Sequence, residues 1–177
     1  MRIKTLSLKD LAIFISDYLR KNDVKTILTG GACVSIYTNN KFKSYDIDFV
    51  LIHDEKQRRI KELLEKIGFF QENRYFKHKD TKYFLDFLKP PPSVGNEPVK
   101  EINEITKGSR KLKLLSPTDC VKDRLAAFYH WNDRQGLEQA ILVCLDNNVD
   151  FIEIERWSHN EGMDDKYKEF KKNITVL

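Results

Sequence analysis

The sequence predicts a mixed α+β fold, in which a β-sheet core at residues 1–115 precedes a helical C-terminal subdomain at residues 116–177. Strand-like and helix-like segments alternate up to about residue 115, and the periodicity is helical from there on. The charge changes sign at the same place. Residues 1–115 hold 23 basic and 15 acidic side chains, a net charge of +8, whereas residues 116–177 hold 8 basic and 12 acidic ones, a net charge of −4.

Composition excludes several protein classes. Hydrophobic residues make up 41% and charged residues 33% of the 177, with only 7 Gly and 5 Pro, so disordered, collagenous and low-complexity chains are excluded. No apolar run approaches the roughly 18 residues of a membrane span. The three cysteines, Cys33, Cys120 and Cys144, are widely spaced and odd in number. They fit neither a disulfide framework nor a metal knuckle, so we expect a cytoplasmic protein without a membrane partner.

The core elements follow from local patterns. Ser7, with Asp10 three residues later, predicts the cap of a helix that runs to about Lys21. Further along the chain, Asp54 is the expected cap of a helix that ends at Gly68. The β-branched and aromatic segments, bounded by turn residues, predict strands at 24–29, 45–52, 74–78, 82–88, 99–105 and 111–115, with a short helix at 32–37.

The C-terminal subdomain has clear helix starts. Ser116 followed by Pro117 and Asp119 offers an N-cap, a proline at the first helical position and a carboxylate at the third. Further helices are expected to start near positions 133, 150 and 164. Trp131 and Trp157 are expected to pack this subdomain onto the core.

Three acidic residues interrupt apolar strands of the predicted core. Asp46 and Asp48 are two residues apart, so their side chains project from the same strand face, while Ile47 faces the opposite side. Asp86 lies between Leu85 and Phe87 in a later strand. Carboxylates inserted in such strands are costly unless a cation accompanies them. If the two strands are neighbours, the three carboxylates could hold two Mg²⁺ ions.

A glycine pair precedes the acidic strand. Gly30 and Gly31 stand between a strand and a helix, where glycine lets the backbone approach a ligand and helix amides attract phosphate. Anion-binding amides and cation-binding acids in one segment indicate a metal–nucleotide site. Taken singly, each feature is also typical of an ordinary turn, a solvated strand edge or an ion pair.

These features together resemble the nucleotidyltransferase fold of the DNA polymerase β superfamily. The resemblance rests on Leu28-Thr29-Gly30-Gly31, on Ser44-Tyr45-Asp46-Ile47-Asp48-Phe49-Val50, and on the later strand with Asp86, and it covers about residues 24–88. It implies that Asp46, Asp48 and Asp86 are catalytic and bind metal, and that Gly30, Gly31 and Ser44 bind the phosphates of a nucleoside triphosphate.

The helical subdomain is similar to that of small bacterial and archaeal nucleotidyltransferases, including abortive-infection toxins, over residues 114–127 and 132–135. By position, the similarity implies that Lys122 and Asp133 bind the nucleotide, with Arg124 as a further phosphate contact. A solvated lysine and an ordinary N-cap are the alternatives for Lys122 and Asp133.

The sequence therefore favours a Mg²⁺-dependent enzyme that transfers a nucleoside monophosphate from an NTP to an acceptor hydroxyl or phosphate. The acceptor could be RNA or tRNA, a protein or a small molecule. The main alternative is a non-catalytic nucleotide-binding protein, or one member of a toxin–antitoxin pair with a toxin or antitoxin partner. RNA binding through the basic core, or base stacking by the aromatic and basic residues at 69–84, is a third option.

Overall fold

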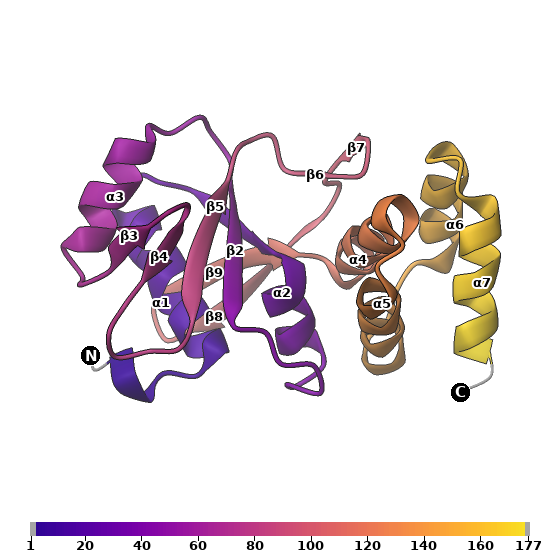
Figure 1. The fold of residues 1–177 in the computed structure, drawn as a ribbon, viewed down its shortest axis with the longest axis horizontal. Helices are drawn as coiled ribbons and strands as arrows, with labels where there is room; N and C mark the ends of the chain where they lie inside the picture. The colour runs from indigo at the N-terminus through magenta and orange to yellow at the C-terminus, as the bar shows by residue number, and fades with distance from the viewer. Residues whose placement is uncertain (1–2, 176–177) are drawn as a thin grey trace.

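The computed structural model describes residues 3–175 and centres on a seven-stranded sheet (Figure 1). The strand order is β3-β4-β5-β2-β1-β9-β8. β5 runs parallel to β2 and β9 runs parallel to β1, while the other neighbouring pairs are antiparallel. The bounds of these strands are β1 (Thr26–Thr29), β2 (Asp46–Leu51), β3 (Phe70–Glu72), β4 (Tyr75–Lys77), β5 (Phe84–Leu88), β8 (Ile102–Lys107) and β9 (Arg110–Leu115).

Helices lie on both sides of the sheet. In Figure 1, α1 and α3 lie on one side of the strands and α2 and α4 on the other. A two-stranded hairpin of β6 (Ser93–Val94) and β7 (Glu97–Pro98) follows β5 and lies against α4. The helix bounds are η1 (Ile3–Thr5), α1 (Leu8–Lys21), α2 (Gly30–Tyr37), α3 (Gln57–Glu65), α4 (Pro117–Trp131), α5 (Arg134–Asp146), α6 (Phe151–Asn160) and α7 (Asp164–Thr175).

Alternation along the central strands separates a buried face from a polar one. Ile47 and Phe49 on β2 and Leu85 on β5 are fully buried, while Asp46 and Asp48 project from the opposite face. Burial of such side chains is the main stabilising contribution to the sheet. The acidic face of β2 is the one that α2 approaches.

Most helix boundaries are set by the expected caps. Ser7 Oγ accepts a hydrogen bond of 3.1 Å from the amide of Asp10, and Ser116 Oγ accepts one of 3.1 Å from Asp119. Asp133 and Asp150 cap α5 and α6 in the same way. The Asp54 prediction is wrong, because α3 starts after Lys56, which makes no side-chain cap hydrogen bond. The patterns also missed β3 and the β6–β7 hairpin, which are two or three residues per strand.

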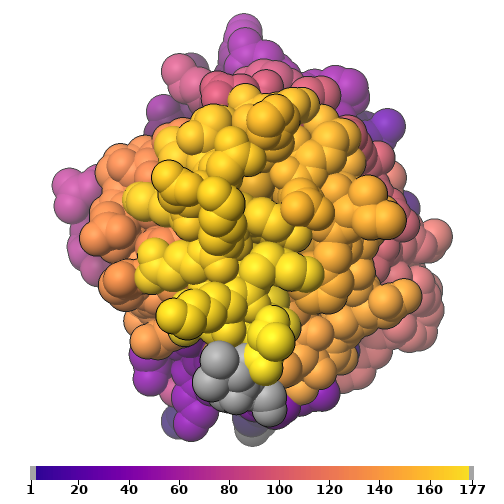
Figure 2. Space-filling model, turned by 90° about the vertical axis from the view of Figure 1, so that its right-hand side faces the viewer, coloured from indigo at the N-terminus to yellow at the C-terminus, as the bar shows by residue number. Residues whose placement is uncertain are grey.

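The C-terminal helices form a layer against α2 and the β6–β7 hairpin. α4 packs on α5 and α6, and Figure 2 shows α6 and α7 covering one end of the molecule. Trp157 is fully buried and donates from Nε1 to the Val94 carbonyl over 3.2 Å, as expected for a packing residue. The same packing role was expected of Trp131, and this prediction is wrong, because its side chain is 77% exposed. Within the described range, no helix is long and apolar enough to span a bilayer.

Gly136 in the first turn of α5 tests the α4–α5 contact. A Cβ atom there would lie 2.7 Å from the Arg124 backbone carbonyl oxygen. Helix propensity alone favours alanine over glycine by about 1 kcal/mol. We expect Gly136→Ala instead to lower the free energy of unfolding by about 2 kcal/mol, because the backbone of α4 must move. Urea unfolding measures the change, and Gln135→Ala in the same turn serves as the control. A stabilised Gly136→Ala protein would contradict the close packing.

Candidate active site

Three carboxylates lie on one face of two adjacent strands. The register of the parallel β2–β5 pair places Asp48 opposite Asp86 and Asp46 opposite Phe84. Because alternate residues share a face, Asp46 and Asp48 point the same way as Asp86. The strands that carry the acids are therefore neighbours, as the sequence analysis required. Asp86 is only 4% exposed, so its charge is largely removed from solvent.

Burial and the crowding of the three carboxylates raise the pKa of Asp48. Burial, followed by the negative charges of Asp46 and Asp86, raises the pKa of Asp48 to about 7 from its ordinary value of 3.8. The Arg124 guanidinium acts in the opposite direction. Asp48 is thus a proton acceptor near neutral pH, and a bound cation would favour its charged form.

The glycine turn lies directly against this carboxylate. Gly30 starts α2 with a φ of +67°, a conformation that other residues rarely adopt, and a Cβ there would lie 2.4 Å from Asp48 Oδ2. A Cβ on Gly31 would lie 3.0 Å from Ser44 Oγ. Position 30 therefore requires glycine, whereas a side chain at position 31 would require Ser44 to move by a few tenths of an ångström. The N-terminus of α2 and the carboxylates form one continuous site.

Ser44 orients the first acid of the strand. Its hydroxyl donates to the Asp46 carboxylate and also lies 3.2 Å from the Asp46 carbonyl oxygen. Its own amide donates to Ser35 Oγ on α2 over 3.0 Å. Ser44 is thus held by α2 and in turn limits the rotation of the Asp46 side chain.

Helix α4 contributes a charged pair to the same place. Asp123 Oδ2 accepts from the Gly30 amide over 3.3 Å, and the Arg124 guanidinium donates to the same oxygen over 3.0 and 2.6 Å. Although burial opposes its charge, the neighbouring Asp123 raises the pKa of Arg124 above its usual value. Arg124 also donates to Gln139 over 3.3 Å, which anchors the cation to α5. A fixed positive charge therefore faces the carboxylates from the helical subdomain.

A cleft extends from this pair along α4. It encloses about 420 Å³, and its wall includes the charged pair, the tip of the β6–β7 hairpin and the end of α4. Trp131 lines the cleft with an exposed indole ring. The lining residues are Gly95, Asn96, Asp123, Arg124, Ala126, Ala127, His130 and Trp131.

Arg74 accompanies Asp86 on the side of the site opposite α4. Arg74 Nε lies 3.2 Å from Asp86 Oδ2, and the guanidinium lies over the Tyr75 ring at 4.8 Å. The arginine side chain is 68% exposed, whereas that of Asp86 is 6% exposed. An exposed arginine can leave its partner more easily than a buried one, so this ion pair can open when another cation approaches.

The chemistry of the donor set suits a hard divalent cation. The groups are carboxylate oxygens, and their mutual repulsion, seen at Asp48, is the kind that a cation relieves. Within residues 3–175, no group of three or more acidic, histidine or cysteine side chains is placed so that it could hold a metal ion by itself. Asp86 is paired with Arg74. Any cation at these carboxylates would therefore need further oxygen ligands, such as substrate phosphates.

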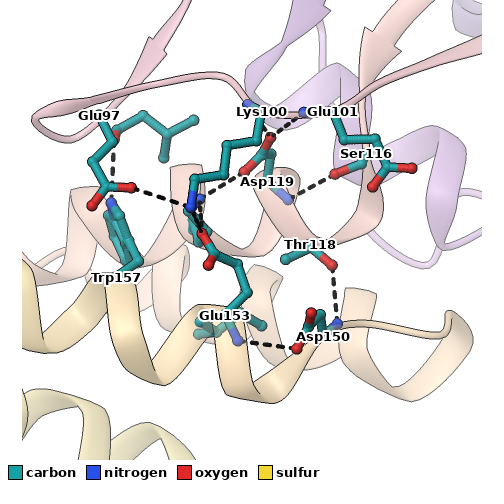
Figure 3. A network of polar contacts seen from close by, with 12 residues as sticks. Glu97, Lys100, Glu101, Ser116, Thr118, Asp119, Asp150, Glu153 and Trp157 are labelled. Atoms are coloured by element: carbon teal, nitrogen blue, oxygen red, sulfur yellow. Dashed lines mark hydrogen bonds and ion pairs between the residues drawn. The ribbon is translucent and has the colours of Figure 1, made fainter.

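The structure does not bring Lys122 to this site. Its side chain is 1% exposed and donates to Asp119 over 2.8 Å and to Glu153 over 3.2 Å, on the side of α4 that faces α6. Figure 3 shows its two partners Asp119 and Glu153 together with Lys100, which also reaches Glu153 at 2.9 Å. A buried ammonium with two carboxylate partners cannot meet a phosphate from solution. Lys122 joins α4 to α6, so it is neither a nucleotide-binding residue nor the solvated lysine that was the alternative.

Asp133 is the N-cap of α5, which is the alternative role that the sequence also allowed. Its carboxylate accepts from the Gln135 amide over 3.0 Å at the start of α5. Its nucleotide-binding role stays a prediction.

Two residues of the site, Asp123 and Arg74, were not predicted from the sequence. A helical pattern does not say which face of α4 meets the glycine turn, and no local signal pairs Arg74 with Asp86.

The comparisons with known proteins identify the fold. No family model and no curated protein matches the sequence. The antigenic nucleotidyltransferase-like protein from Paracoccidioides brasiliensis is similar with a TM-score of 0.59 at 15% identity, over 77% of this chain and 74% of that one. The antibiotic-resistance factor ANT(2'')-Ia is similar with a TM-score of 0.54 at 13% identity, over 99% and 97%. Its complex with adenylyl-2''-tobramycin gives 0.51 at 15%, over 86% and 94%.

The protein therefore has a nucleotidyltransferase-like fold, with a mixed α+β core and a helical C-terminal region. This confirms the fold predicted from the glycine pair and the acidic strand.

The raised pKa of Asp48 predicts a pH-dependent cost to stability. In the metal-free protein the folded state retains a proton on Asp48 up to about pH 7, whereas an unfolded aspartate loses it near 3.8. Stability therefore falls as pH rises from about 4 to 7. We expect the stability advantage of Asp48→Asn over wild type to grow by about 1–2 kcal/mol between about pH 5.5 and 8.5. Urea unfolding without divalent cations measures it. Asp146→Asn is the control, and an advantage independent of pH would refute the shifted pKa.

Replacing Lys122 separates a structural role from nucleotide binding. Lys122→Met leaves Asp119 and Glu153 without their buried cation, so we expect the free energy of unfolding to fall by about 3 kcal/mol. NTP affinity, measured by titration calorimetry on folded protein, should change by less than about twofold. Lys111→Met removes a half-exposed lysine in an ion pair and controls for the loss of charge. Unchanged stability with lost NTP affinity would instead place Lys122 in the nucleotide site.

Proposed function

We propose that this protein is a Mg²⁺-dependent nucleotidyltransferase, which transfers a nucleoside monophosphate from an NTP to an acceptor hydroxyl or phosphate. The observation that carries the proposal is the convergence of Asp46, Asp48 and Asp86 on one face of adjacent strands, against the Gly30 amide. Three acids crowded in this way weaken the fold, so a site that retains them needs a cation to be satisfied.

Asp46 and Asp48 are the proposed metal ligands, with Asp86 as a third. When bound, Mg²⁺ would neutralise the phosphate oxygens and the charge that develops on the attacking and leaving oxygens. Asp86 would also accept the proton of the acceptor hydroxyl. Ser44 would hold Asp46 in place through its hydrogen bond to that carboxylate.

The α2 and α4 side of the acids is the proposed place of the triphosphate. The amides at the start of α2, at Gly30 and Gly31, are suited to phosphate oxygens. In the free protein the Asp123 carboxylate accepts from the Gly30 amide and also pairs with Arg124. A phosphate that replaced Asp123 at this amide would meet both the N–H group and the Arg124 guanidinium. The cleft that continues to Trp131 would then accommodate the nucleoside, with the exposed indole available for stacking.

The neighbours support nucleotide chemistry without naming the acceptor. One solved structure holds ANT(2'')-Ia with adenylyl-2''-tobramycin, which is an adenylylated small molecule. The three free cysteines, two of them buried, agree with the proposed cytoplasmic location. A toxin or antitoxin partner stays a prediction.

Incubation with each labelled NTP, Mg²⁺ and a panel of RNA, protein and small alcohols tests the reaction. Wild type should transfer label, and Asp46→Asn should lower the rate by at least about 10³-fold, because charge stabilisation in the transition state is lost. Asp146→Asn, a carboxylate paired with Lys41 outside the site, should retain the rate. NTP binding, followed by calorimetry with Mg²⁺, is read in parallel. Binding that is equal in wild type and Asp46→Asn, with no transfer by either, would contradict the enzyme and favour a nucleotide sensor.

A further inference from the structure

An aromatic surface extends from the carboxylates across β5, β4 and β3. On these strands one face is buried, with Phe76 at 2% and Leu85 at 0% exposure. The other face carries the buried Asp86 and the half-buried rings of Tyr75 and Phe84, and it becomes exposed at Phe70 (48%) and Leu88 (41%). We call this face the aromatic platform; it consists of Phe70, Glu72, Tyr75, Lys77, Phe84 and Leu88, with Arg74 at its edge.

The register joins the platform to the acids. Phe76 on β4 lies opposite Leu85 on β5, so the antiparallel pairing places Tyr75 beside Asp86 on the same face. Tyr75 meets Phe84 edge-to-face, with ring centroids 5.1 Å apart. On the next strand Phe70 lies opposite Lys77. A continuous row of ring faces and aliphatic surface therefore starts at the third carboxylate and ends at the edge of the sheet.

Cations accompany the rings. Arg74 lies over the Tyr75 ring, and Lys77 pairs with Glu72 across the β3–β4 turn. Nearby, Lys82 lies 4.8 Å from the centre of the exposed Tyr45 ring, on the loop that enters β5. Residues 70–88, which span the three strands, hold four basic and three acidic side chains, a net charge of +1. The platform therefore has cations beside its rings, and the two nearest, Arg74 and Lys77, each pair with an acid of the same face.

The platform also lies on the flank of the site that the nucleotide would leave free. The glycine turn, Arg124 and the cleft approach the acids from the α2 and α4 side, whereas Asp86 and Tyr75 lie on the β4 side. In-line transfer needs the acceptor on the side of the carboxylates away from the leaving pyrophosphate. The acceptor would therefore approach across the platform.

We propose that the acceptor is the end of a single-stranded nucleic acid, whose bases stack on the aromatic platform while its phosphates meet Arg74 and the lysines. This inference rests on the proposed function, because it names the substrate of the same site. Ring faces next to cations recognise single strands by stacking and charge, with little dependence on sequence. The terminal hydroxyl of the strand would lie at Asp86, and Arg74 would exchange that carboxylate for a phosphate of the strand.

The first test measures binding of fluorescent 12-nucleotide single strands of RNA and DNA by anisotropy, with the full chain. We expect Phe70→Ser to weaken binding by about tenfold through loss of one stacking surface. Ile102→Ser is the matched control, because Ile102 is 43% exposed on β8 at the opposite edge of the sheet. It should leave the affinity within about twofold. Equal losses in both variants, or none in Phe70→Ser, would overturn the platform.

The second test uses charge. Lys77→Gln should weaken binding and lower the slope of log affinity against log salt by about 0.7. Lys111→Gln is the matched control, since Lys111 forms a comparable cross-strand pair with Glu104 between β8 and β9. It should leave the slope unchanged. A loss common to both lysines would indicate general attraction to a basic protein and would overturn the site.

Transfer of label then identifies the acceptor, with RNA, DNA and tobramycin offered separately. Transfer of label to RNA or DNA that is reduced by Phe70→Ser but not by Ile102→Ser supports the inference. The ratio of label on RNA to label on DNA shows whether ribose or deoxyribose is preferred at the acceptor end. Label on tobramycin alone would overturn the inference. Mg²⁺-dependent NTP binding is measured on the same samples. If that binding is intact while no strand is bound or labelled, this inference fails and the proposed function stands. If it is absent, the proposed function itself fails.

Discussion

The repulsion between three carboxylates is the constraint on which the site depends. The parallel pairing of β2 with β5 places Asp48 opposite Asp86, and strand alternation adds Asp46 to the same face. Water cannot fully solvate these groups, and the protein responds by holding a proton on Asp48 up to about pH 7. A fold optimised only for stability would replace such acids, so their presence argues for a ligand that supplies positive charge.

The charges around the acids come from different parts of the chain. Arg124 reaches the site from the helical subdomain, and Arg74 reaches it from β4. Between them, the glycine turn brings backbone amides against Asp48. The sheet alone therefore holds the acids but not the cation that faces them across the glycine turn. The packing of α4 on α2 completes the site, while the buried Lys122 network holds α4 to α6 on the other side.

Sequence patterns correctly predicted the features that depend only on residues close together in the chain. The caps at Ser7 and Ser116, the acidic strand and the glycine turn follow from neighbouring residues, and the structure has them. The short strands β3, β6 and β7 were missed because their pairing, and not their composition, creates them. The face of α4 was also beyond local patterns. Lys122 and Asp123 differ by about 100° around a helix, and only tertiary packing decides that Asp123 meets the Gly30 amide.

The two flanks of the acids explain how one fold can serve different acceptors. The flank at α2 is built from backbone amides and buried charge, which suit any triphosphate and leave little freedom to the sequence. The flank at β4 is a partly exposed sheet face, where substitutions cost little stability, so its side chains can change with the acceptor. In this chain the proposed acceptor side has Arg74 over the Tyr75 ring and beside Asp86, and the end of a single-stranded nucleic acid would meet both the rings and the cation.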